Sequence, residues 1–74
     1  MNNIYFKCVN AIKFHRIIKL DGFYACYQCD SILCYMNKNL HRLFYIESNK
    51  QLECAFINET IFLENIVVEN ILVK

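Results

Sequence analysis

The residues best suited to chemistry in this sequence are cysteines. Cys26 and Cys29 are separated by two residues and follow an aromatic pair and the only glycine of the chain. Two thiolates at this spacing, in a backbone that folds back on itself, can bind one tetrahedral zinc ion together with two ligands from a second turn of the same kind. Upstream, Cys8 begins such a second half, but Ala11 occupies its fourth position. The predicted metal ligands are therefore Cys8, Cys26 and Cys29.

Two states of this site stay open on the sequence alone. In one, zinc is the cofactor and His15 or Cys34 completes the tetrahedron. In the other, the site has decayed and its thiols are buried like small apolar side chains. A redox role is disfavoured because no helix is expected to begin after Cys26, and a helix N-terminus is what lowers the pKa of a reactive thiol. Cys34 and Cys54 lie in apolar segments, where we expect buried core thiols.

Basic residues offer the second kind of chemistry, which is contact with phosphate. The net charge is only +1, but residues 1–50 contain seven of the eight lysines and arginines, while residues 51–74 contain four glutamates against Lys74. A basic segment of this kind can neutralise nucleic-acid phosphates. The residues predicted to bind RNA are Lys7, Lys13, His15, Arg16, Lys19, Lys38, His41 and Arg42. Exposed Tyr24, Tyr27 or Tyr35 could stack on bases.

Catalytic chemistry is not indicated. His15 and His41 have no carboxylate at a spacing typical of a catalytic triad, and the sequence contains no recognisable pair of acids or glycine-rich phosphate loop. We therefore expect a protein that is not an enzyme and has no small-molecule substrate.

Short alternating runs of apolar and polar residues predict the elements that position these side chains. Strands are expected at residues 4–7, 12–20, 23–26, 32–35, 42–46 and 52–57, because alternation with a period of two is typical of half-buried strands. Asp21 and Gly22 form the strongest turn signal. The prediction is an all-β fold: a small antiparallel, zinc-ribbon-like sheet over residues 1–57, with a degenerate first knuckle.

The end of the chain has a different pattern. Three five-residue units begin at Glu59, Glu64 and Glu69, and a period of five matches neither a helix nor a strand. The β-branched content favours extended structure, with a helix as the alternative. Residues 58–74 are therefore predicted to form an apolar and acidic, strand-rich extension that covers the sheet or docks onto a partner.

Length and composition limit the remaining possibilities. A chain of 74 residues is one domain at most, and a domain of this size buries only about 60% of its unfolded surface, so we expect a metal, a partner or a tight sheet to stabilise it. Glutamates interrupt the most apolar region, so no membrane partner is expected. The odd number of cysteines, without a leader typical of secretion, predicts a reducing, cytoplasmic location.

One resemblance to a known family involves the second cysteine pair. Residues 26–34 have the pattern Cys-x-x-Cys-x-Ser-Ile-Leu-Cys, and Arg42 and Leu43 follow eight residues later. This arrangement resembles the core of the small-subunit ribosomal protein 27 family of eukaryotes (metallopanstimulin), which is a zinc ribbon. Residues 6–8 are similar to its first knuckle, and residues 53–56 are similar to its closing segment.

The resemblance implies a structural constituent of the small ribosomal subunit that contacts rRNA and neighbouring ribosomal proteins. It assigns Cys8, Cys26 and Cys29 as zinc ligands, while Ala11 and the acidic tail depart from the family pattern. Two alternatives stay open. One is a zinc-ribbon protein–protein interaction module of a transcription-type complex, whose tail adds a strand to a partner sheet. The other is the zinc-ribbon protein of the large ribosomal subunit, which residues 21–26 also resemble.

Overall fold

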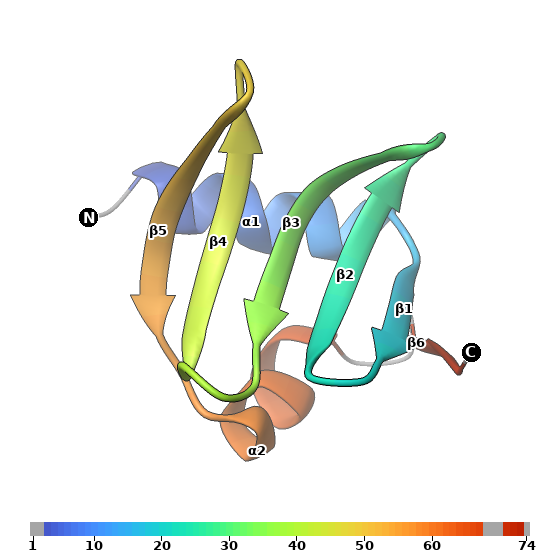
Figure 1. The fold of residues 1–74 in the computed structure, drawn as a ribbon, viewed down its shortest axis with the longest axis vertical. Helices are drawn as coiled ribbons and strands as arrows, with labels where there is room; N and C mark the ends of the chain where they lie inside the picture. Colours follow the sequence, from blue (N-terminus) through green and yellow to red (C-terminus); the bar gives the residue numbers. More distant parts are fainter. Residues whose placement is uncertain (1–2, 68–70, 74) are drawn as a thin grey trace.

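The computed structural model describes residues 3–67 and 71–73 of the chain. In this part of the protein, a helix lies across one face of a sheet (Figure 1). The elements, in chain order, are α1 (Asn3–Phe14), β1 (Ile17–Leu20), β2 (Phe23–Gln28), β3 (Ser31–Asn37), β4 (Arg42–Glu47), β5 (Lys50–Phe56), α2 (Glu59–Phe62), the π-helical segment η1 (Leu63–Val67) and β6 (Ile71–Val73).

The sheet has the order β5-β4-β3-β2-β1-β6. Strands β1 to β5 follow one another as antiparallel neighbours, and β6 lies parallel to β1 at the edge. The predicted turn between β1 and β2 is present, and Gly22 has a φ of +84° that residues with a side chain rarely adopt. The prediction of a mostly β fold with an antiparallel sheet is therefore confirmed.

The N-terminal segment differs from the prediction. Residues 4–7 were expected to form a strand, but they belong to α1. The apolar side chains of Ile4, Cys8 and Ile12 recur every four residues, which places them on one face of a helix, and Cys8 and Ile12 are buried there. As a result, no knuckle forms around Cys8, and strand β1 begins only at Ile17, after the helix has ended.

The core lies between the sheet and α1. Its largest fully buried side chains include Tyr24, Met36 and Leu43 from the sheet and Ile12 from α1. Because neighbouring residues of a strand point to opposite faces, the register that pairs Tyr24 with Met36, and Met36 with Leu43, puts all three on the face covered by α1.

The C-terminal extension folds back onto the same core. The Asn58 side chain accepts a hydrogen bond of 2.8 Å from the backbone N–H of Ile61 and so caps the start of α2. Phe62 and Ile66 are buried in the core, and the Phe62 ring lies 5.2 Å from that of Tyr24. The extension therefore covers the sheet, which was one of its two predicted roles. It was predicted to be rich in strands, but it consists of helical turns followed by one short strand. Residues 68–70 and 74 of the predicted extension lie outside the described residues.

The opposite face of the sheet has no helix over it within the described chain (Figure 1). Its central residues are aromatic: the Tyr35 ring is stacked on Phe44 at 5.1 Å and meets the edge of Phe23 at 6.3 Å. We call these three residues the open aromatic row. Within the described residues, no helix has the length and apolar character needed to cross a bilayer.

Candidate nucleic-acid interface

Four of the five cysteines are buried in the core. Cys26 of β2 and Cys34 of β3 are opposite one another in the register, and the Cys26 thiol donates to the backbone carbonyl of Ala11 at 3.5 Å. The Cys8 thiol interacts with those of Cys34 and Cys54. A hydrogen bond with Cys34 and burial raise the pKa of Cys26, so its thiol stays protonated. The prediction that Cys34 and Cys54 are buried core thiols is confirmed.

The three predicted zinc ligands have different surroundings. Cys8 lies in α1 and Cys26 in β2, both buried, whereas Cys29 is exposed in the turn between β2 and β3 with a φ of +55°. Within the described part of the chain, no three side chains of the metal-binding types converge as a ligand set. Zinc binding by Cys8, Cys26 and Cys29 stays a prediction, and metal analysis of the purified protein tests it.

Three of the eight residues predicted to bind RNA are paired with glutamates. The pairs are Lys7 with Glu47 at 2.8 Å, Lys38 with Glu59 at 3.9 Å, and Arg42 with Glu53 at 2.5 Å. Lys38 also lies 4.7 Å above the Tyr24 ring, and Arg42 lies 4.4 Å above the Phe56 ring. A phosphate at these positions competes with a carboxylate that is already bound.

Four of the remaining predicted residues follow one another closely in the sequence around the end of α1. Lys13 is in the last turn of the helix, His15 and Arg16 form the connection, and Lys19 lies in β1. We call Lys13, His15, Arg16 and Lys19 the basic corner. The side chains of Lys13, Arg16 and Lys19 are exposed, and among the described residues no carboxylate forms an ion pair with Arg16 or Lys19.

An exposed aromatic ring accompanies the basic corner. Phe14 lies between Lys13 and His15 in the chain, and its side chain is 79% exposed. An uncovered ring among cations suits single-stranded nucleic acid, because bases stack on aromatic faces while the cations contact phosphates. Sequence reasoning selected the neighbouring cations but missed Phe14, whose position inside the basic segment was the available signal.

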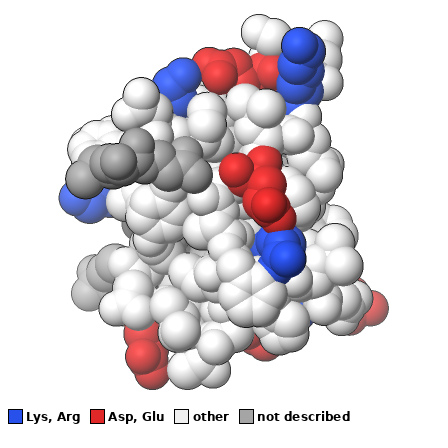
Figure 2. All heavy atoms as spheres, turned by 90° about the vertical axis from the view of Figure 1, so that its left-hand side faces the viewer, with Lys and Arg blue, Asp and Glu red and all other residues white. Residues whose placement is uncertain are grey.

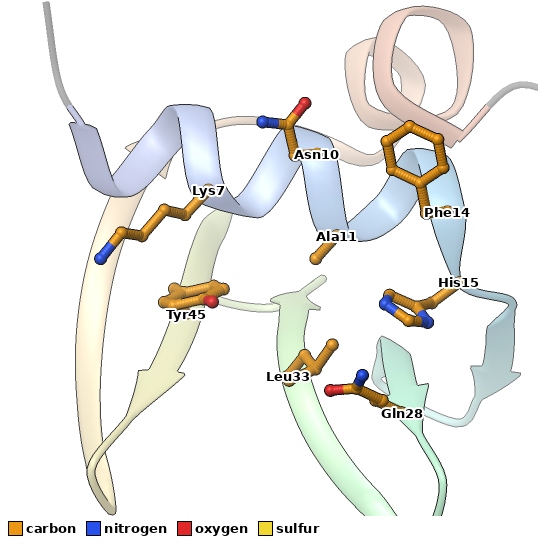
Figure 3. A pocket seen from close by; sticks show the side chains of 8 residues that line it. All are labelled: Lys7, Asn10, Ala11, Phe14, His15, Gln28, Leu33 and Tyr45. Atoms are coloured by element: carbon orange, nitrogen blue, oxygen red, sulfur yellow. The ribbon is translucent and has the colours of Figure 1, made fainter.

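A groove lies next to the basic corner, between α1 and the sheet (Figure 3). It is a hollow of about 330 Å³. Its lining residues are Lys7, Asn10, Ala11 and Phe14 of α1, His15, Gln28 of β2, Leu33 of β3 and Tyr45 of β4. We call this hollow the α1 groove.

The interior of the α1 groove is mostly apolar and aromatic. Ala11 points into it from the helix, and Leu33 points toward Ala11 from the sheet (Figure 3). Tyr45 and His15 bound it from opposite sides, and Gln28 lies below His15 (Figure 3). Because Ala11 contributes only a methyl group, the space between helix and sheet stays open at this point.

The tyrosines predicted to stack on bases have unequal exposure. Tyr24 is only 1% exposed, so that prediction is wrong for this residue. Its hydroxyl donates a hydrogen bond of 2.5 Å to Glu59. Burial is the main cause that raises the pKa of Tyr24 to about 12, and this hydrogen bond is the second. Tyr35 belongs to the open aromatic row, and its hydroxyl donates to Gln51. Tyr27 is partly exposed.

The side of the molecule formed by β5 has no concentration of one charge. Figure 2, which shows this side, has a few acidic and basic side chains separated by wide uncharged areas. A phosphate backbone therefore finds no continuous basic surface there. The basic corner, on α1 and β1, has three exposed lysines and arginines within seven residues, and it is therefore the electrostatic candidate for a nucleic-acid contact.

Compared with models of known protein families, with curated proteins and with solved structures, the chain matches none of them. Any function assigned to the protein therefore depends on its residues and their geometry.

Proposed function

We propose that this protein is a structural, rRNA-contacting constituent of the small ribosomal subunit, with the basic corner as its phosphate-binding surface. The resemblance of residues 26–34 to a ribosomal zinc-ribbon family supports the choice of assembly. The observation that supports the choice of surface is that Lys13, His15, Arg16 and Lys19 lie within seven positions of the chain, which also contain the exposed ring of Phe14.

The remaining predicted cations have a secondary role in this proposal. Lys7, Lys38 and Arg42 are engaged by glutamates, and His41 lies 6.0 Å from the Phe56 ring. These residues stabilise the fold locally, and they contact RNA only where a phosphate displaces a carboxylate. The RNA affinity is therefore assigned mainly to the four residues of the basic corner.

The open aromatic row supports the second part of the proposal, which is contact with neighbouring ribosomal proteins. Phe23, Tyr35 and Phe44 form a half-buried apolar surface on a sheet face that no helix of the described residues covers. Uncovered apolar surface of this kind is typical of protein interaction sites.

The tail-based alternative stays open. Ile71–Val73 pairs with β1 of the same chain and is the edge strand of the sheet, where a partner strand can still be added. The other alternative is a place in the large ribosomal subunit. Co-sedimentation with isolated subunits distinguishes it from the present proposal.

The test is co-sedimentation of the purified protein with isolated small or large ribosomal subunits over a range of salt concentrations. We expect binding to the small subunit that weakens as salt rises. The variant Lys19→Gln removes one cation of the basic corner, and Lys50→Gln removes an exposed lysine at the β4–β5 turn as the matched control.

Each lost phosphate contact changes the slope of log affinity against log salt by about 0.7 for a single strand. We expect this change for Lys19→Gln and an unchanged slope for Lys50→Gln. Equal slopes for both variants and the unmodified protein would remove the basic corner from the proposal. Binding to the large subunit alone would contradict the proposed place in the small subunit and favour the large-subunit alternative.

Phe14 provides an independent test of the same surface. Phe14→Ala is expected to weaken binding to single-stranded RNA, because a base–aromatic contact contributes about 1–3 kcal/mol. Phe6→Ala is the control, since Phe6 is also an exposed phenylalanine of α1, at 55%, but does not line the groove. An equal effect of the two substitutions would contradict a specific role for Phe14.

A further inference from the structure

We propose that the α1 groove binds one unpaired nucleobase of a single-stranded RNA. This inference rests on the proposed function, because it places the base beside the phosphate contacts of the basic corner. It adds a site that the charge pattern alone does not indicate.

The size of the groove fits a single flat group. Its volume of about 330 Å³ is at the lower limit of small-molecule pockets, which run from about 300 to 1,000 Å³. The methyl group of Ala11 and the side chain of Leu33 face one another across it (Figure 3). A planar ring inserted between them covers apolar surface on both of its faces.

The polar groups of the groove match the edges of a base. Gln28 extends toward the hollow (Figure 3), and an amide side chain both donates and accepts hydrogen bonds. The edges of nucleobases contain donors and acceptors side by side, and unpaired bases are recognised through these edges. Tyr45 and His15 add aromatic rings on opposite sides of the hollow.

The charges around the groove favour a base over other occupants. A lysine or arginine side chain of a partner would need a carboxylate in the groove. The described lining residues include none. Lys7, at one end, is already paired with Glu47, so the groove is not primarily an anion site. His15 belongs to both the groove and the basic corner, which places a phosphate next to a base bound in the groove.

The experiment compares two RNA ligands with the full chain. One is a tetranucleotide of adenosine, and the other is an abasic tetranucleotide with the same sugars and phosphates. For the unmodified protein we expect the adenosine chain to bind about 5- to 150-fold more tightly, the range of one base stacked on a protein surface. The affinities are measured by the shift of backbone amide resonances in a titration.

The decisive variant is Ala11→Leu, which fills the groove while keeping a good helix former in α1. We expect it to lose the preference for the adenosine chain while its affinity for the abasic chain stays unchanged. The dispersion of its amide resonances shows whether this variant is folded. Asn3→Leu, which adds the same side chain at the opposite end of α1, is expected to keep the preference.

A second variant, Gln28→Ala, tests the edge contact without altering the shape of α1. It is expected to reduce the preference for the adenosine chain by a smaller factor than Ala11→Leu. If the unmodified protein binds both chains with salt-dependent affinity but without a preference for the adenosine chain, or if Ala11→Leu keeps that preference, the inference is overturned while the phosphate-binding proposal stands. If the unmodified protein binds neither chain, both proposals fail.

Discussion

The two faces of the sheet both carry large apolar and aromatic side chains, but only one face is buried. On the covered face, Tyr24, Met36 and Leu43 are at most 1% exposed beneath α1 and the C-terminal helical turns. On the other face, Phe23 and Phe44 remain partly exposed, and each contacts the ring of Tyr35, which lies between them in the sheet. The comparison shows that alternation along a strand does not determine which face becomes the core. The helix that packs on the sheet makes that choice.

The same comparison explains the unusual composition. A chain that is 57% hydrophobic has more apolar side chains than one covered face can bury. The excess lies on the open aromatic row and on exposed phenylalanines such as Phe14 and Phe56. The open aromatic row and Phe14 are the surfaces assigned above to neighbouring proteins and to RNA.

The largest expected contrast is in thiol reactivity. Cys29 is exposed, whereas Cys8, Cys26, Cys34 and Cys54 are buried on the covered side. With a thiol-specific reagent at neutral pH, we expect one thiol per native chain to react quickly and the other four only when the protein opens or unfolds. The variant Cys29→Ser should remove the fast phase, and two or more fast thiols would contradict the buried cluster.

The next contrast is in stability, between neighbouring residues that point to opposite faces. Leu43→Ala removes a fully buried side chain and should lower the free energy of unfolding by about 2–5 kcal/mol. Phe44→Ala, on the open face, should cost about 1 kcal/mol, because the ring loses mainly a contact with another ring. Urea unfolding measures both values.

The size of the Leu43 effect is large for this chain, since a domain of this length has a total stability of roughly 4–11 kcal/mol. A cost for Phe44→Ala equal to or above that for Leu43→Ala would mean that the open face is also a core.

The smallest expected effect concerns the attachment of α2 to the covered face. Tyr24→Phe removes the hydroxyl that donates to Glu59 and should lower the free energy of unfolding by about 1 kcal/mol. Asn58→Ala, which removes the cap of the same helix, is expected to cost a similar amount. An unchanged free energy of unfolding for Tyr24→Phe would show that this hydrogen bond does not hold α2 in place.

Tyr24 also predicts a specific pH dependence. Its pKa is about 12 in the folded protein against 10.0 ordinarily, so the unfolded chain loses this proton first. The contribution of Tyr24 to stability is therefore complete below pH 10 and is lost as the pH rises from 10 to 12. Over this range the unmodified protein should lose more stability than Tyr24→Phe, and parallel curves for the two proteins would contradict the raised pKa.

Sequence reasoning was most successful where the signal was local. The strands β2 to β5 were predicted because alternation and turn residues lie next to one another in the chain. The helix α1 was missed because residues 4–7 alone are too short to distinguish the two periods, and the spacing of Ile4, Cys8 and Ile12 becomes clear only over a longer window.

The candidate site was predicted only in part, for the same physical reason. The basic residues at positions 13–19 are close in sequence, and they lie at the end of α1, in the connection and in β1. The pairing of Lys7 with Glu47, across 40 positions, depends on the tertiary fold. The α1 groove combines side chains from α1 and three strands, so no local pattern could indicate it.

The central claim is that RNA contacts the basic corner and the neighbouring groove, while the open aromatic row faces protein. The most direct measurement is a two-dimensional amide NMR titration of the isotope-labelled chain with the adenosine tetranucleotide. The account predicts shifts concentrated at residues 13–19, with Gln28 and Leu33 also affected. Shifts confined to Phe23, Tyr35 and Phe44, or no shifts at any ratio of RNA to protein, would contradict it.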